Sequence, residues 1–302
     1  MDLAAAHDAP MDLAAAHWSN FIYTHIARRW HALWCRWGPS GDLLSRFHAE
    51  RIFTPSEDGC MMQVVYHYED GRGTVSDGPA CGPWQITQAA HSRADGLAHP
   101  SSPDSMTTLL LPGGPSAWCM KHSSIGQPCA VELFLHHGDD LRMSAGVIHN
   151  AEGNLQQLSL IREDARGPWP SAGWSSDTQA TRVTALELSE ALQAAGAPVA
   201  SRGVGYAITA NLQQEPFSAE WPSTRVAAAG SADVVLICAE KQVALVAPER
   251  RIEGVGFSSA AAWWPAAGAE AACLYTIEAS WDSQGTLEGV RFLMFERPAV
   301  SY

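Results

Sequence analysis

The chain has 302 residues, which exceeds the usual size of one domain, so we expect two domains. It is 46% hydrophobic and contains 12 tryptophans, enough apolar material for ordinary cores and too much for a disordered protein. The net charge is −13 and no stretch clusters Lys or Arg, which excludes nucleic acid as a partner and makes an anionic membrane surface a poor one.

The N-terminal segment contains the heptapeptide MDLAAAH twice within its first 17 residues. It carries Asp but no Lys or Arg, unlike a secretory signal or an organelle transit peptide. We therefore expect residues 1–16 to be a mobile tail. Ser19 or Asn20 is expected to cap a short helix that runs to about Arg29.

From Trp30 onward the pattern changes to alternating side chains and frequent turn residues. Trp30, Trp34 and Trp37 are spaced for one helix face as well as for an entering strand, and we interpret them first as a plug at the base of a barrel. Eight predicted strands follow, at residues 43–53, 61–68, 83–87, 107–111, 117–122, 130–136, 141–149 and 155–162. Short strands at this spacing are typical of an up-and-down barrel, so residues 17–166 are expected to form one lipocalin-like barrel.

A stretch rich in Gly, Pro and Ser, residues 167–182, is the predicted linker, which Trp169 and Trp174 are suited to anchor. Residues 184–195 fit a helix and a strand equally well. A second lipocalin-like barrel is expected over residues 183–302. Its predicted strands are residues 200–214, 234–238, 243–246, 257–264, 271–278 and 287–295.

The second half repeats the strand order of the first. Each half ends on a hairpin of the pattern (Asn/Asp)-x-x-Gly-x-Leu, at residues 150–155 and 282–287. Glycine takes the positive φ that such a turn needs, and leucine opens the next strand. Because the preceding strands and turns recur in the same order, we infer an internal repeat. The predicted fold class is all-β, with two tandem antiparallel barrels and a short N-terminal helix.

Seven scattered cysteines include no Cys-x-x-Cys pair, which predicts reduced and mostly buried thiols rather than a disulfide framework or a zinc site. No segment has the apolar length that a membrane span requires. The sequence lacks H-E-x-x-H, G-x-S-x-G, G-x-G-x-x-G and a phosphate loop. We therefore expect no metal, no cofactor and no transmembrane segment.

Several stretches carry a family resemblance: WSNF at 18–21, WHALWCRW at 30–37, GDLL at 41–44, MTTLLLP at 106–112, VELF at 131–134 and IRED at 161–164. They resemble an uncharacterised domain family of cyanobacteria and photosynthetic eukaryotes, over most of residues 18–298. The resemblance implies two lipocalin-like barrels and a fold similar to the bilin lyases of phycobiliproteins, which grip a linear tetrapyrrole without a metal. It implies no activity and no catalytic residue. A cytoplasmic or plastid-stromal protein, not a secreted one, is expected.

Charged side chains at every second strand position mark either a polar lumen or a solvent face. Such sets include Arg46 with His48, His67 on the next strand, Glu132 with Phe134, and Arg142. One face of most antiparallel strands is wet, so the outward orientation is favoured. If these side chains point inward instead, they line a polar end of an aromatic cavity, where an arginine suits a carboxylate.

The opening of a lipocalin-like barrel commonly carries Gly-x-Trp, and an arginine of the last strand stacks on that tryptophan. Here Ala32-Leu33-Trp34 occupies the opening, and alanine is small enough to keep the assignment. Arg162 is the candidate stacking arginine. The predicted ligand-binding residues are therefore Trp34, Trp37, Arg46, His48, His67, Glu132, Phe134, Arg142 and Arg162.

The sequence favours a protein that binds or handles a bulky hydrophobic small molecule, such as a pigment, a tetrapyrrole or a lipid-like ligand. Two alternatives stay open. One is a cofactor-free chromophore lyase or isomerase that uses Glu132 and His48 as an acid–base pair. The other is an assembly factor for a photosynthetic complex, which acts through a protein partner. All 12 histidines lie in the first half, so the site is expected there.

Overall fold

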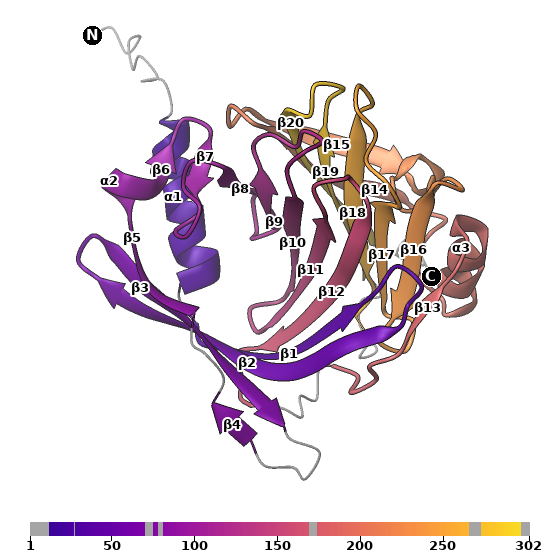
Figure 1. The fold of residues 1–302 in the computed structure, drawn as a ribbon, viewed down its shortest axis with the longest axis horizontal. Helices are drawn as coiled ribbons and strands as arrows, with labels where there is room; N and C mark the ends of the chain where they lie inside the picture. Colours follow the sequence, from indigo (N-terminus) through magenta and orange to yellow (C-terminus); the bar gives the residue numbers. More distant parts are fainter. Residues whose placement is uncertain are drawn as a thin grey trace, which may run out of the picture.

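The computed structural model describes residues 12–26, 28–69, 75–77, 81–168, 174–265 and 273–296. Two antiparallel sheets follow one another along the chain and pack against each other, with a short helix at the N-terminal end (Figure 1). The predicted all-β fold, with two consecutive antiparallel units and this helix, is confirmed. Among the helices of the described ranges, none has the length and apolar character to cross a membrane.

The N-terminal helix begins earlier than the sequence analysis predicted. It runs as α1 (Leu13–Phe21) and continues as a π-helix, η1 (Ile22–Ile26). The Asp12 side chain caps it by accepting a hydrogen bond from the backbone N–H of Ala15 at 3.1 Å. Leucine followed by three alanines favours helix strongly, so the second MDLAAAH copy starts the helix instead of extending the tail. Residues 1–11 of the predicted tail lie outside the described residues.

The first sheet curls into a nearly closed barrel, with α1 lying at its opening (Figure 1). Its strand order is β4-β3-β2-β1-β12-β11-β10-β9-β8-β7-β6, and β5 pairs with β3. The strands are β1 (Trp30–Trp37), β2 (Leu43–Ser56), β3 (Gly59–Glu69), β4 (Val75–Asp77), β5 (Cys81–Thr87), β6 (Ser92–Arg93), β7 (Gly96–Ala98), β8 (Met106–Leu110), β9 (Ser116–Met120), β10 (Cys129–His137), β11 (Leu141–His149) and β12 (Leu155–Asp164). A single turn of helix, α2 (Gln88–His91), follows β5. All eight predicted strands are present, and the tryptophan-rich segment is a strand.

The second sheet has the order β13-β16-β17-β18-β19-β20-β14-β15. Its strands are β13 (Ala180–Arg182), β14 (Arg202–Thr209), β15 (Gln214–Glu220), β16 (Asp233–Cys238), β17 (Val243–Pro248), β18 (Phe257–Trp263), β19 (Cys273–Trp281) and β20 (Leu287–Glu296). The segment left open at residues 184–195 is a helix, α3 (Ala185–Ala194), because Thr184 and Glu187 form a capping box at its start. A short 3₁₀ turn, η2 (Trp221–Ser223), follows β15.

The two sheets share one hydrophobic core, built from the outer face of the first barrel and the facing side of the second sheet. Leu33, Leu133 and Met143 of the first barrel belong to this core together with Leu236 and Trp263 of the second sheet. The predicted linker is anchored here, since the ring of Trp174 stacks on Trp263 with 4.7 Å between centroids. Trp169 lies outside the described residues.

The opposite side of the second sheet is filled by its own side chains. Trp221 and Phe295 pack edge to face at 5.9 Å, and Leu188 and Leu192 of α3 join the same cluster. One enclosed space beside this cluster measures only about 30 Å³. The part of the second unit around Trp221 and Phe295 is therefore a packed core, and a pocket of about 760 Å³ lies beyond it, lined by Arg225, Ser258 and Glu278 among others.

The internal repeat reappears as reciprocal contacts between the halves. The repeated hairpin of each half forms backbone hydrogen bonds to a segment of the other half, in two equivalent pairs. In the first pair, Arg251 N–H donates to Gly153 O (2.8 Å) as Ser123 N–H does to Gly285 O (2.7 Å). In the second pair, Leu155 N–H donates to Glu249 O (2.9 Å) as Leu287 N–H does to Lys121 O (3.0 Å). Gly153 and Gly285 both have positive φ, as the repeated turn pattern predicts. Reciprocal pairing of this kind is the signature of a two-fold relation, here within one chain.

Arg251 is the strongest departure from this symmetry, because its equivalent in the first half is a serine. The residue is 2% exposed. Its guanidinium donates to the Ser123 hydroxyl at 2.6 Å and to the carbonyls of Gln127 and Asn150 at 2.8 and 2.9 Å. With a longer bond to the carbonyl of Ser124 (3.4 Å), one buried side chain of the second half thus binds four residues of the first.

Replacing this side chain tests how much its contacts with the first half stabilise the protein. We expect Arg251→Ala to lower the free energy of unfolding by about 2–4 kcal/mol, because buried acceptors lose a charged donor. The exposed neighbour provides the matched control, and Arg250→Ala should cost less than about 0.5 kcal/mol. Urea unfolding followed by tryptophan fluorescence measures both. Equal effects of the two substitutions would contradict this role of Arg251.

Candidate functional site: the lumen of the first barrel

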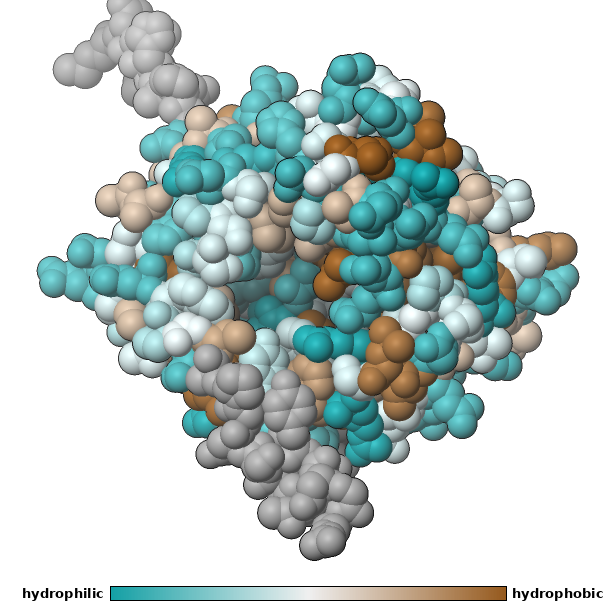
Figure 2. All heavy atoms as spheres, in the orientation of Figure 1, coloured by the Kyte–Doolittle hydropathy of each residue, from teal (hydrophilic) through white to brown (hydrophobic). Residues whose placement is uncertain are grey.

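The inward faces of the first-barrel strands enclose a lumen that contains both aromatic rings and charges. Register partners in antiparallel strands share a face. Glu132 on β10 lies between Trp118 of β9 and Gly146 of β11, and Phe134 lies opposite Ser144. Figure 2 shows a hollow in this face of the molecule, where Figure 1 has the space enclosed by the first sheet, with hydrophilic residues in its depth.

Two arginines and two glutamates form a continuous chain of contacts across the lumen. Arg142 donates to Glu163 through Nε (2.5 Å to Oε2) and Nη2 (3.0 Å to Oε1). Arg51 has Nε 3.0 Å from Glu163 Oε1 and donates through Nη2 to Glu132 Oε1 at 2.5 Å. The hydroxyl of Ser144 donates to the same Glu132 oxygen at 2.7 Å. The side chains of Arg142 and Glu163 are 0% exposed, so mutual pairing is what offsets the cost of removing their charges from water.

The chain keeps Glu132 ionised. Burial alone would raise the pKa of this carboxyl, but the charge of Arg51 and the hydrogen bonds from Arg51 and Ser144 outweigh it, so the pKa lies below its usual value. Burial also lowers the pKa of Arg142, and Glu163 opposes that effect. Glu132 remains 26% exposed although it points inward, which shows that solvent reaches the lumen.

An aromatic wall faces this charged chain. Trp34 stacks on Phe47 with 5.2 Å between centroids and meets the edge of Tyr66 at 5.8 Å. Arg36 lies over the same wall, with its guanidinium carbon 4.8 Å from the Phe47 centroid. Buried polar atoms of the lumen without a hydrogen-bond partner among the described residues include Trp34 Nε1, Arg36 Nε, Thr108 Oγ1 and His136 Nε2.

The helical plug α1–η1 packs against β6, β7 and β8 at the edge of the first sheet (Figure 1) and reaches the lumen through two histidines. His25 has Nδ1 2.9 Å from Arg142 Nη1 and Nε2 3.2 Å from the Ser116 hydroxyl. Because arginine only donates, His25 accepts at Nδ1 and carries its proton at Nε2. His17 Nε2 accepts the backbone N–H of Leu110 at 2.8 Å. Burial lowers the pKa of both imidazoles, that of His17 to about 4, so both are neutral at pH 7.

The structure brings four of the predicted ligand-binding residues together in the lumen: Trp34, Glu132, Phe134 and Arg142. The outward orientation that the sequence favoured for Glu132 and Arg142 is therefore wrong. These strands have no wet face of the usual kind, because the second sheet covers their outer side. The inward-facing alternative holds for these residues.

The other predicted residues lie away from the lumen. Arg46 and His48 pair in register with Cys35 and Leu33, which places both on the outer face of the barrel, and His67 lies opposite His48. Glu132 and His48 thus lie on opposite sides of the barrel wall and do not form the acid–base pair considered from the sequence. The carboxylate is paired with an arginine instead.

Arg162 and Trp37 are both buried between the two sheets. Arg162 lies opposite Leu33 on the outer face, donates to the carbonyl of Ser175, and has Nη2 3.5 Å from the sulfur of Cys35. Trp37 donates through Nε1 to the carbonyl of Thr178 at 3.0 Å. The predicted stacking of Arg162 on Trp34 is therefore wrong. Trp34 pairs with Ile161, and Arg162 is the next residue along β12, so its side chain lies on the opposite face of the sheet.

Sequence reasoning missed Arg51, Glu163, Arg36 and His25. The sequence could have indicated the first two, because each is a charged residue that continues a series of apolar residues at every second strand position. Arg51 continues the inward set that contains Phe47 and Ala49, and Glu163 follows Ile161. No comparable pattern marks His25, whose place depends on where the helix packs.

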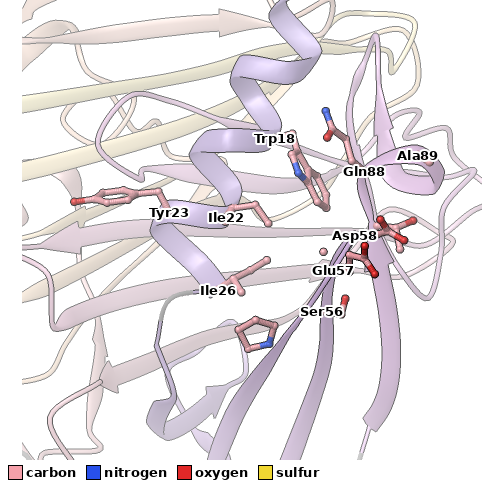
Figure 3. A pocket seen from close by; sticks show the side chains of 12 residues that line it. Trp18, Ile22, Tyr23, Ile26, Ser56, Glu57, Asp58, Gln88 and Ala89 are labelled. Atoms are coloured by element: carbon pink, nitrogen blue, oxygen red, sulfur yellow. The ribbon is translucent and has the colours of Figure 1, made fainter.

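A groove outside the lumen has a volume of about 960 Å³. Trp18, Ile22 and Ile26 point into it from the plug, across from Glu57 and Asp58 of the turn between β2 and β3 (Figure 3). Both acidic residues are exposed, so the groove lacks the desolvated polar groups that specify a ligand. In the described ranges, no cluster of three or more His, Cys, Asp or Glu is arranged to hold a metal.

Residues 14–168 match a family model described as "Domain of unknown function (DUF3598), N-terminal". A solved structure of a DUF3598 protein with unknown function, from Nostoc punctiforme, has a TM-score of 0.58 and 12% identity, covering 93% of this chain and 99% of that chain. At that identity the likeness shows the fold alone.

A tesB protein of Mycobacterium avium subs paratuberculosis has a TM-score of 0.12 and 9% identity, covering 60% of this chain and 77% of that chain, and this score is too low to indicate a shared fold. No curated protein matches significantly. The family match covers half of the chain, and the solved relative shares the architecture of both halves. The chain therefore belongs to the DUF3598 family.

Proposed function

We propose that the protein binds a bulky, hydrophobic small molecule in the lumen of the first barrel, as lipocalins do. Pigments, tetrapyrroles and lipid-like molecules are the candidate ligands. The observation that carries the proposal is the contrast between the two interiors. The first combines an aromatic wall with buried polar atoms on the same inner face that lack partners among the described residues, whereas Trp221 and Phe295 belong to an apolar cluster that packs the middle of the second.

The lumen supports binding better than catalysis. Glu132 and Glu163, its two paired carboxylates, are both held by arginines, and the pKa of Glu132 lies below its usual value. A general acid or base needs a pKa near the working pH. These groups serve instead as a fixed polar end against which a ligand is positioned.

A blocking substitution tests the proposal. Gly146 lies opposite Glu132 on the lumen face and its φ is not positive, so Gly146→Leu adds a side chain to the lumen; its Cβ would lie 3.3 Å from the Ser159 Cβ, which has to move by a few tenths of an ångström. We expect the wild type to bind the neutral dye Nile red saturably at one site. The blocked variant should bind at least about tenfold more weakly, because a leucine occupies the space that the ligand needs.

Gly230→Leu is the matched control, since Gly230 is exposed in the second half and a Cβ there meets only the Asp233 carboxylate at 3.7 Å. It should bind the dye as the wild type does. The proposal fails if the wild type shows no saturable binding, or if the blocked variant binds equally well while thermal unfolding confirms that it is folded.

A further inference from the structure

Arg36 leaves the lumen with one positive charge that no described carboxylate matches. Arg51 and Arg142 are matched by Glu132 and Glu163. Arg36 is a third cation on an inward face, and no described carboxylate forms an ion pair with it. Its guanidinium is held by ring faces instead, 4.8 Å from the Phe47 centroid and 5.5 Å from the Trp34 centroid. Ring faces offset only part of the cost of desolvating a cation.

Two unmatched donors lie next to each other on this strand. Trp34 and Arg36 are two positions apart on β1 and therefore face the same side, about 7 Å apart along the strand. Trp34 Nε1 and Arg36 Nε are both buried without an acceptor. Both atoms are obligatory donors, so the group that completes them has to be an acceptor.

The surroundings specify the rest of that group. Ser159 and Ser45 lie opposite Arg36 on the flanking strands, so its polar neighbours are neutral hydroxyls. The nearest large surfaces are the rings of Phe47, Trp34 and Tyr66. An anion here would meet a guanidinium and an indole N–H, and an apolar body attached to it would rest on aromatic faces.

We infer that the ligand is a carboxylic acid with an apolar body, and that Arg36, assisted by the Trp34 indole N–H, holds its carboxylate. This inference rests on the proposed function and names the ligand class for the same lumen. The pairing of a guanidinium with a carboxylate is bidentate and strong in a desolvated site. A fatty acid and a tetrapyrrole acid share this chemistry, and the experiment separates them.

Four probes test the inference by intrinsic tryptophan quenching: cis-parinaric acid and its methyl ester, and protoporphyrin IX and its dimethyl ester. We expect the wild type to bind the acid of at least one pair on the order of ten- to a hundredfold more tightly than its ester. Binding of only the parinaric or only the porphyrin acid identifies the lipid-like or the tetrapyrrole source.

Arg36→Gln should reduce the acid-over-ester preference to about twofold or less, because affinity for the acid falls much more than affinity for the ester. Arg46→Gln is the matched control, because Arg46 belongs to the outer face of the neighbouring strand, and it should keep the full preference. Arg36→Lys retains the charge without the planar guanidinium, so its acid-over-ester preference should lie between those of the wild type and Arg36→Gln. It provides a second variant if Arg36→Gln does not fold.

The result that overturns the inference is binding of acid and ester with equal affinity by the wild type, or a full preference that persists in Arg36→Gln. In either case the protein still binds, and the proposed function stands. If the wild type binds none of the four probes and no Nile red, the proposed function itself is wrong and the inference falls with it.

Discussion

Replacing Glu163 by glutamine is expected to lower the free energy of unfolding by about 3–5 kcal/mol, because it leaves buried cations without their counter-charge. The Glu163 side chain is 0% exposed and pairs with both Arg142 and Arg51. In the variant only Glu132 remains to balance two arginines. Urea unfolding at pH 7 measures the loss.

Two further variants sharpen this prediction. Glu249→Gln removes the surface ion pair between Glu249 and Arg182, whose side chains are 51% and 38% exposed. It should lower the free energy of unfolding by less than about 1 kcal/mol. The double variant Arg142→Met/Glu163→Leu should recover much of the lost stability, because no unpaired charge stays buried at that position. A Glu163→Gln variant as stable as the wild type would show that the charged chain contributes nothing.

Mild acid is expected to destabilise the protein through its buried histidines. Burial lowers the pKa of His17 to about 4, and burial together with the charges of Arg142 and Arg28 lowers that of His136 to about 3. In the unfolded chain both titrate near the ordinary histidine pKa of 6.5, so the unfolded state binds more protons between pH 6.5 and about 4. Stability is full above pH 6.5 and falls as the pH decreases through this window, by about 3 kcal/mol for His17 alone.

Urea unfolding at pH values between 7.5 and 4.5 tests the histidine contribution. His17→Gln removes the titrating group, and its amide oxygen can still accept the Leu110 N–H, so the pH dependence should become shallower. His122 is exposed, and His122→Gln should leave the slope unchanged. If His17→Gln retains the full pH dependence, the buried imidazole is not its source.

Local patterns predicted the strands well and the helix start poorly. β11 matches its predicted bounds because Gly and Asp turns bracket an alternating segment on both sides. The helix was placed too late because Ser19 and Asn20 are good capping residues, whereas Asp12 precedes the stronger helix formers. Residues 200–214 form parts of two strands, since Leu212 takes a positive φ that its sequence does not announce.

The sequence predicts which site residues share a face of the sheet, but not which face lines the lumen, because that depends on how the second sheet packs. Alternation shows which residues share a face, and it does so correctly for Arg46 with His48 and for Glu132 with Phe134. It does not show which face is the lumen when both sides of the wall are covered. The sequence of the first half carries no mark of the second sheet that buries Arg162 and Trp37.

The covered wall has a further consequence for how the chain finds its pairing. On β10 the even positions Glu132 and Phe134 face the lumen, whereas the odd positions Leu133 and Leu135 join the core between the sheets. A slip of one residue in β10 would place the Glu132 carboxylate in an apolar interface and leave Arg51 without this partner. Both faces would be penalised at once, so the pairing of these strands is fixed from two sides. The same charges that line the lumen therefore also disfavour a one-residue slip of β10.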